Sequence, residues 1–165
     1  MTSSLMFLQV VCVLLIYVGN CRGLGGCGFE GVFNVGDLCF LSSTTKMTWM
    51  ETRSFCDHFG YESIIIEDHP NTTEVKEYLD NLQQTGEYWT GATDLLEEGA
   101  WYWEDLEEGS LLDQANSGWA PGRPLKSKKF NCLYLKYEPE TFLWYDGNCR
   151  AKKFPICYDE LRLGK

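Results

Sequence analysis

Cysteine is the residue type that most constrains the fold of this chain. Eight cysteines occur in 165 residues, and the first two, Cys12 and Cys21, lie within or just after an apolar N-terminal run. The other six are spread over the rest of the chain, at Cys27, Cys39, Cys56, Cys132, Cys149 and Cys157. An even set of cysteines in an oxidising compartment predicts a disulfide framework. Six thiols can pair in many ways, so their number alone does not choose a pairing.

The N-terminal run indicates the compartment. Residues 5–18 (LMFLQVVCVLLIYV) are apolar except for Gln9, and small and polar residues follow. The run resembles a signal peptide and is shorter than the roughly 20 apolar residues that span a bilayer. We expect residues 1–21 to be a signal peptide and the protein to be secreted, without a membrane anchor. No Lys or Arg precedes the run, so a short N-terminal anchor is the alternative.

Length and charge narrow the class further. Residues 22–165 are long enough for one domain with one core, which we expect over 27–158. The formal net charge of -10 repels nucleic acid and anionic membranes at long range, and neither is expected as a partner. Aromatic residues make up 15% of the chain, which argues against disorder.

A hairpin and a helix are predicted early in the chain. Residues 31–42 (GVFNVGDLCFLS) form two short apolar pieces around Gly36 and Asp37, a hairpin pattern. Thr48 and Glu51 form a capping-box pattern for a helix over 48–59, and Gly60 follows where a C-terminal cap is expected.

A buried strand and a second helix come next. Residues 61–67 (YESIIIE) predict the strand. The second helix is predicted over 72–82, with Asn71 as its N-terminal cap and Val75, Leu79 and Leu82 as its inner stripe.

The second half changes to short strands separated by polar loops. The strands are predicted over 88–93, 101–103, 132–137, 142–145 and 154–158. Residues 104–131 hold only scattered apolar positions, and so long a loop in a compact domain is usually functional. The fold class is therefore α+β, with two helices, small antiparallel sheets and one long loop region.

These elements and motifs, in order, resemble the C-type lectin-like domain, and most closely its small, secreted, single-domain invertebrate type. Residues 89–92 (WTGA) stand where the family has Trp-Ile-Gly-Leu, 101–103 (WYW) match its aromatic strand, and 144–146 (WYD) resemble its Trp-Asn-Asp motif. Trp119, Gly122 and Pro124 resemble its long-loop signature, and 154–157 (FPIC) its closing strand. The resemblance implies that Trp89, Trp101 and Trp144 lie in the core.

The resemblance also implies a disulfide pairing. It joins Cys56 to Cys157, Cys132 to Cys149, and Cys27 to Cys39. The first bond closes a loop of about a hundred residues, which in the chain-entropy model stabilises a fold by roughly 4 to 5 kcal/mol.

The usual calcium and sugar site of the family departs from its pattern here. The long-loop triplet Glu-Pro-Asn or Gln-Pro-Asp is replaced by Arg123, Pro124 and Leu125, and Tyr145 replaces the Asn of Trp-Asn-Asp. Of the expected ligands, Asp146 clearly survives. Calcium takes 6 to 8 oxygen ligands, and the Arg123 charge would repel it, so we expect no cofactor at this position. Asp94 and Glu98 match part of an accessory calcium site, although a solvated acidic turn explains them as well.

The long loop carries a cluster of positive charge. Arg123, Lys126, Lys128 and Lys129 lie within seven residues of a chain that is otherwise acidic. Guanidinium and ammonium groups bind carboxylate, sulfate and phosphate. We predict that this loop, with Pro124, Leu125, Asp146 and an aromatic platform at Tyr145, binds an anionic ligand. The alternative is that the charges serve only solubility.

The remaining signals concern modification and catalysis. Asn71-Thr72-Thr73 is an N-glycosylation sequon, which also reads as a plain helix cap. The two histidines, His58 and His69, lie in no metal-binding spacing, and no carboxylate pair stands out, so we expect no enzyme. The function predicted is recognition of glycans or anionic microbial-surface polymers, as in innate immunity. A calcium-independent module that binds a protein is the alternative.

Overall fold

In the computed structural model, the placed residues are 27, 32–66, 71–104, 110–112, 118–139 and 141–160. The predicted signal peptide (1–21) and His69 lie outside these residues. No helix in this part of the chain is both long enough and apolar enough to cross a membrane.

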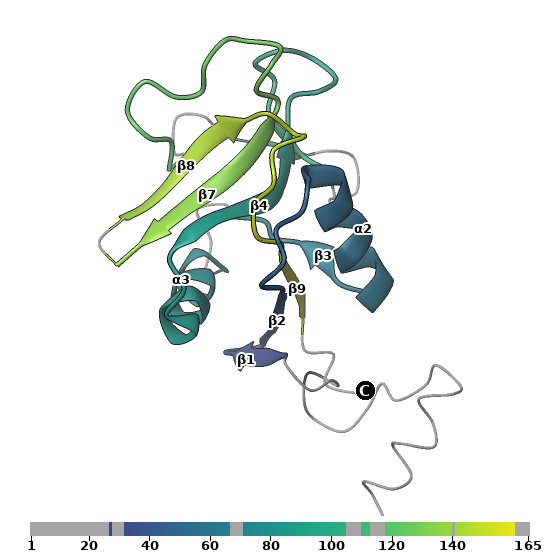
Figure 1. Ribbon diagram of the computed structural model, residues 1–165, viewed down its shortest axis with the longest axis vertical. Helices are drawn as coiled ribbons and strands as arrows, with labels where there is room; N and C mark the ends of the chain where they lie inside the picture. The colour runs from purple at the N-terminus through teal and green to yellow at the C-terminus, as the bar shows by residue number, and fades with distance from the viewer. Residues whose placement is uncertain are drawn as a thin grey trace, which may run out of the picture.

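Two antiparallel sheets and two helices form the domain, which confirms the predicted α+β class (Figure 1). The first sheet has the order β1-β2-β9-β3 and the second the order β6-β5-β4-β7-β8. The strands are β1 (Phe33–Val35), β2 (Leu38–Ser42), β3 (Glu62–Ser63), β4 (Gly86–Thr93), β5 (Tyr102–Trp103), β6 (Ser110–Leu111), β7 (Cys132–Glu138), β8 (Thr141–Gly147) and β9 (Ile156–Glu160). The helices are α2 (Trp49–Phe59) and α3 (Asn71–Leu82).

The predicted capping of the first helix is confirmed. The Thr48 hydroxyl accepts from the Glu51 N–H, and the Glu51 carboxylate accepts from the Thr48 N–H at 2.8 Å. The Thr48 hydroxyl also donates to the Glu51 carboxylate, and the two donations to the carboxylate, from the Thr48 N–H and from its hydroxyl, lower the pKa of the Glu51 carboxyl. Gly60 ends the helix in the left-handed conformation, with φ 73°. A side chain there would be strained, which is why glycine suits the position.

Three sequence predictions need correction. The strand predicted over 61–67 is only two residues long, because Ile64 leaves the ladder to connect the two sheets: its N–H donates to Ile156 O and its carbonyl accepts from Gly91 N. Asn71 was expected to cap the second helix but is its first helical residue. The long loop also holds a short strand, β6, paired with β5.

All three disulfides implied by the family resemblance are present. Cys56 bonds Cys157, with 5.5 Å between the Cα atoms, and joins α2 to β9. Cys27 bonds Cys39, and Cys132 bonds Cys149 with 5.2 Å between the Cα atoms.

The core beneath the long loop is built from tryptophans. Trp89, Trp101 and Trp144 are buried, as predicted. The ring of Trp119, from the loop, packs edge-on against Trp101 and Trp144 with centroids 5.0 and 6.2 Å apart. Aromatic pairs of this geometry add stability beyond their burial. These tryptophan rings form a rigid base beneath the loop.

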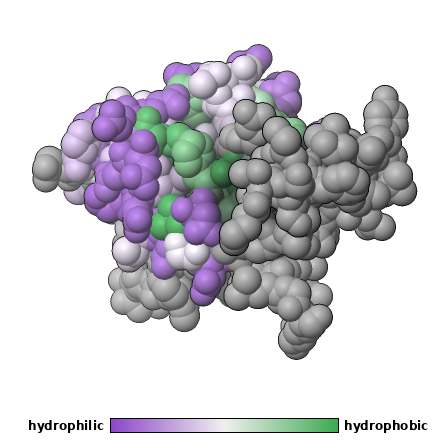
Figure 2. Space-filling view, turned by 90° about the horizontal axis from the view of Figure 1, so that it is seen from below, coloured by the Kyte–Doolittle hydropathy of each residue, from purple (hydrophilic) through white to green (hydrophobic). Residues whose placement is uncertain are grey.

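At the opposite end of the domain, which bears β1 and α3, the described surface mixes hydrophobic and hydrophilic residues (Figure 2).

Candidate functional site

The long loop is fixed to the sheet by backbone hydrogen bonds on both sides. Ala120 N donates to Trp144 O at 3.0 Å, and Trp144 N donates to Gly118 O at 2.9 Å, so residues 118–120 run alongside β8. At the other end of the loop, Asn131 O accepts from Asp94 N and from the Thr93 hydroxyl. Residues 121–130 therefore project from one end of the sheet between two fixed points (Figure 1).

The centre of the site is a carboxylate held by the loop. Asp146, on β8, has a fully buried side chain. Its Oδ1 accepts from Arg123 Nη1 at 2.8 Å, and its Oδ2 accepts from Leu125 N at 3.0 Å. Arg123 Nη1 also approaches the Asp146 carbonyl oxygen at 3.4 Å. Both oxygens of the one surviving family ligand are therefore engaged by residues of the replaced triplet, whose Arg123–Pro124 peptide is cis.

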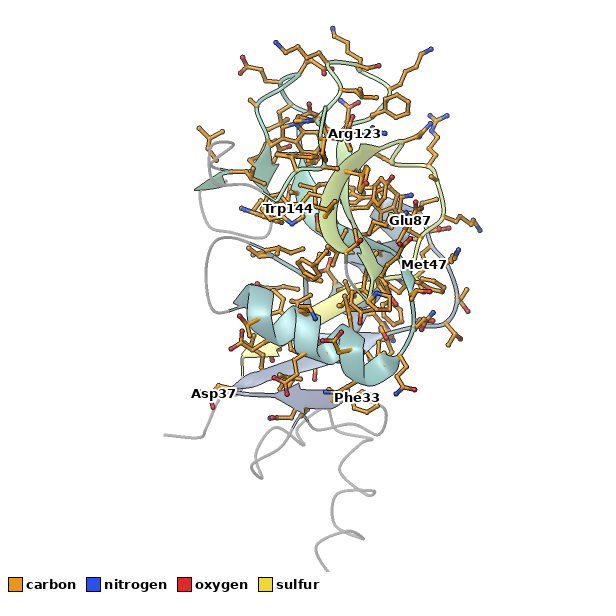
Figure 3. The ribbon with its side chains drawn as sticks, turned by 90° about the vertical axis from the view of Figure 1, so that its left-hand side faces the viewer. Phe33, Asp37, Met47, Glu87, Arg123 and Trp144 are labelled. Atoms are coloured by element: carbon orange, nitrogen blue, oxygen red, sulfur yellow. A yellow bond between two sulfur atoms is a disulfide. The ribbon has the colours of Figure 1, made fainter. Side chains whose placement is uncertain are left out.

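An aromatic and cationic row extends from this pair to Glu87; Figure 3 labels Arg123 and Glu87, the two ends of the row. The Arg123 guanidinium lies 5.4 Å from the Tyr145 ring centroid, and Tyr145 stacks on Tyr134 with centroids 5.4 Å apart. On Tyr134, in turn, lies the Lys153 ammonium, 3.7 Å from the ring centroid and 2.6 Å from the Glu87 carboxylate. Tyr145 is thus part of a packed row, and its ring lies between Tyr134 and Arg123 in that sequence of contacts.

Sequence reasoning missed Tyr134 and Lys153. The alternation of β7, in which Leu133 and Leu135 are buried, is a signal that could have placed Tyr134 on the outer face beside Tyr145. No comparable signal marks Lys153, which is only 7% exposed despite its charge.

The donor set does not fit a calcium ion at the family's usual position. Calcium needs six or more oxygen ligands, several of them carboxylates. Asp146 supplies one carboxylate, which already accepts two hydrogen bonds, and the Arg123 charge lies beside it. Within the residues that the structure describes, no three His, Cys, Asp or Glu side chains are grouped so that they could hold a metal ion.

The two acidic residues of the partial accessory site are arranged differently from one another. Asp94 is 2% exposed, and its Oδ2 accepts from Gly99 N at 2.8 Å, so its carboxylate closes the turn. Its Oδ1 has no hydrogen-bond partner among the described residues. Burial raises the pKa of the Asp94 carboxyl, and the negative charge of Glu98 adds to this increase. Glu98 itself is exposed.

The three lysines of the loop face solvent and are not bonded to Asp146. Lys126, Lys128 and Lys129 are exposed, whereas Arg123 and Pro124 are half-buried. Leu125 is 41% exposed. The structure thus divides the predicted site residues into an internal group, Arg123 with Asp146 and Tyr145, and a solvent-facing group of three lysines. Asn71 begins α3, and the placement of its side chain lies outside what the structure describes.

Comparison with known proteins agrees with the fold. A family model described as the lectin C-type domain matches residues 45–159, and the chain belongs to this family of recognition modules. Perlucin from Haliotis laevigata is 28% identical over 123 residues, which are 74% of this chain and 76% of perlucin. The mouse scavenger receptor C-type lectin carbohydrate-recognition domain has a similar structure, with a TM-score of 0.67 at 23% identity over 82% of this chain and 98% of that one. A calcium-independent type II antifreeze protein has a TM-score of 0.64 at 25% identity, covering 80% and 93%.

Proposed function

We propose that this protein is a secreted, non-catalytic recognition protein that binds anionic glycans or microbial-surface polymers through its long loop. It does so without calcium at the position where sugar-binding relatives hold it. The observation that carries this proposal is the ion pair of Arg123 and Asp146, together with the bond from Leu125 N.

The Arg123 guanidinium supplies, beside Asp146, the positive charge that a metal ion would otherwise supply. A buried carboxylate needs a compensating positive charge or hydrogen bonds. Arg123 brings that charge from the loop itself and ties the loop to β8, so the loop keeps its position without a metal ion. The similarity to an antifreeze protein described as calcium-independent supports a fold of this type that works without the ion.

The ligand class follows from the side chains that face solvent. Arg123 is committed to Asp146, whereas Lys126, Lys128 and Lys129 are exposed around the exposed Leu125. Ammonium groups are natural partners for sulfate, phosphate and carboxylate. The contact surface is therefore cationic although the chain has a formal net charge of -10.

The test is binding of the purified protein to immobilised heparin and to lipopolysaccharide, each with calcium and with a chelator. We expect equal binding in both conditions, and loss of binding in the variant Lys128→Glu with Lys129→Glu. The matched control is Lys76→Glu with Lys136→Glu, which changes the net charge equally at lysines paired with Asp80 and Glu138. Binding that disappears with chelator would restore the ordinary calcium mechanism and overturn the proposal.

A protein partner is the second candidate, and exposed leucines favour it. Leu96 is 85% exposed and Leu111 is 69% exposed. Large apolar side chains on a surface are common at protein interfaces when they are contiguous. A glycan array without any hit, combined with a protein partner whose binding is lost in the variant Leu96→Ser, would select this candidate.

Secretion is tested separately and in either case. The chain should be recovered from the medium of expressing cells, and its new N-terminus should be sequenced.

A further inference from the structure

A second basic segment lies directly across a disulfide from the lysines of the long loop. Arg150 and Lys152 follow Cys149, whose Cα lies 5.2 Å from that of Cys132. Lys129 precedes Cys132 by three residues. Because consecutive Cα atoms are about 3.8 Å apart, the Cα atoms of Lys129 and Arg150 lie within about 20 Å of each other.

Ion pairing separates these residues from the other cations of the described chain. Arg53 pairs with Glu104, Lys76 with Asp80, Lys136 with Glu138, Arg123 with Asp146 and Lys153 with Glu87, and Lys46 lies over the Phe154 ring. Among the residues that the structure places, five basic side chains are exposed and have neither a carboxylate partner nor a cation–π contact with an aromatic ring: Lys126, Lys128, Lys129, Arg150 and Lys152. All five belong to the two segments that the Cys132–Cys149 bond joins. We call them the bipartite basic surface.

Three carboxylates of the described residues that lie on this side of the domain are engaged with other groups. Asp146 and Glu87 pair with Arg123 and Lys153. The Lys152 charge is the smallest of the effects on the pKa of the Glu51 carboxyl. The Glu51 carboxylate accepts two hydrogen bonds from Thr48 as part of the helix cap. Nitrogen-tipped side chains project from the loop end and from the adjacent edge near Met47 and Glu87 (Figure 3). The positive charge of the surface is therefore available to a ligand.

We propose that the anion-binding surface continues across the Cys132–Cys149 disulfide onto Arg150 and Lys152, and that its ligand is a linear polyanion such as a sulfated polysaccharide. This proposal rests on the function proposed above and adds to it both the second segment and the class of polymer. A single acidic sugar reaches one segment, whereas an extended chain with repeated charges reaches both.

The energetics favour an extended ligand. An exposed ion pair contributes only about 0.2–1 kcal/mol, so one lysine and one sulfate do not hold a ligand. Several pairs made along one polymer add together, because the polymer loses its translational freedom once. Release of counterions from the polymer adds a salt-dependent term for each charge neutralised, as it does for nucleic acids.

The test compares a long heparin-derived oligosaccharide with a heparin-derived disaccharide, using the full mature chain. In the variant Arg150→Glu with Lys152→Glu, we expect affinity for the long oligosaccharide to fall by about tenfold. The slope of log affinity against log salt concentration should fall by about two. Affinity for the disaccharide, which occupies the loop lysines, should not change. Lys76→Glu with Lys136→Glu is again the control of equal charge.

The outcomes separate this inference from the function proposed above. If the Arg150 and Lys152 variant binds the long oligosaccharide as tightly as the control does, while the Lys128 and Lys129 variant does not bind it, the inference is wrong and the loop function stands. If the unaltered protein binds neither ligand, both are wrong. A circular dichroism spectrum and melting midpoint equal to those of the unaltered protein establish that each variant is folded.

Discussion

Arg123 and Asp146, 23 residues apart in the chain, form a hydrogen-bonded ion pair of 2.8 Å. The Asp146 side chain is fully buried, whereas that of Arg123 is 27% exposed. The two partners are therefore not equivalent. Removing the arginine strands a buried carboxylate, whereas removing the carboxylate leaves an arginine that water can reach.

The first prediction follows from this asymmetry. Arg123→Ala should lower the free energy of unfolding by about 3 kcal/mol, because it leaves Asp146 with Leu125 N as its remaining donor. Asp146→Asn should cost less. Urea denaturation of both variants and of the double variant measures the coupling. Strictly additive losses would contradict the assignment of the pair as the tie between loop and sheet.

The second prediction concerns calcium. A cation bound only by the folded state raises the melting midpoint. Because we propose that the long loop binds no calcium, added calcium should leave the midpoint of the unaltered protein unchanged. The triple variant Arg123→Glu, Leu125→Asn and Tyr145→Asn recreates the triplet and the Trp-Asn-Asp motif of sugar-binding relatives. It removes the competing charge and frees Asp146, and its midpoint should rise with calcium. A rise in the unaltered protein, reversed by a chelator, would be inconsistent with the proposed site.

The framework of this protein could be predicted from its sequence because its signals are local or covalent. The capping box of Thr48 and Glu51 is a local signal, and the six cysteines predict a covalent framework whose pairing the family resemblance implies. The strand over 61–67 was overestimated because Ile64–Ile66 are as apolar as a central strand. The backbone of Ile64 instead bonds to both sheets, and that arrangement depends on residues far away in the chain.

The residues of the candidate site could be selected from the sequence, but their arrangement could not. The sequence places Arg123 among the loop cations, yet its partner is Asp146, and the loop register that joins them is a tertiary feature. Arg150 and Lys152 lie outside the predicted basic cluster. They become neighbours of it only through the Cys132–Cys149 bond, which sequence distance conceals.

The third prediction uses the pH dependence of stability at Asp94. Because burial raises the pKa of this carboxyl, the folded state binds its proton more tightly than the unfolded state does. The stability that this group contributes is present below the unfolded pKa and is lost as the pH rises through the folded pKa. Asp94→Asn, which can still accept from Gly99 N, should therefore raise the melting midpoint at pH 7.

The difference between Asp94→Asn and the unaltered protein should shrink as the pH falls below about 4, where both side chains are neutral. Asp37→Asn, at the exposed turn between β1 and β2, removes the same charge and serves as the control. A lower midpoint for Asp94→Asn at pH 7 would show that the ionised carboxylate is stabilising. That result would revive the accessory cation site of Asp94 and Glu98.

The fourth prediction concerns Lys153, whose charge is almost fully buried against aromatic rings. Its ammonium lies 3.7 Å from the Tyr134 centroid, 5.1 Å from the Trp89 centroid and 2.6 Å from the Glu87 carboxylate. Lys153→Ala removes both the packed aliphatic stem and the cation–π contacts, and should cost about 2 kcal/mol in unfolding free energy. Lys153→Met keeps the stem and should cost less. Glu87 is 43% exposed, so water can hydrate its carboxylate after either change.

The same variant should also affect binding. Because Tyr134 stacks on Tyr145, which lies beside Arg123, Lys153→Ala should weaken polyanion binding more than Glu87→Gln does. Stability and binding in Lys153→Ala equal to those of the unaltered protein would mean that the row of cations and rings does not support the loop.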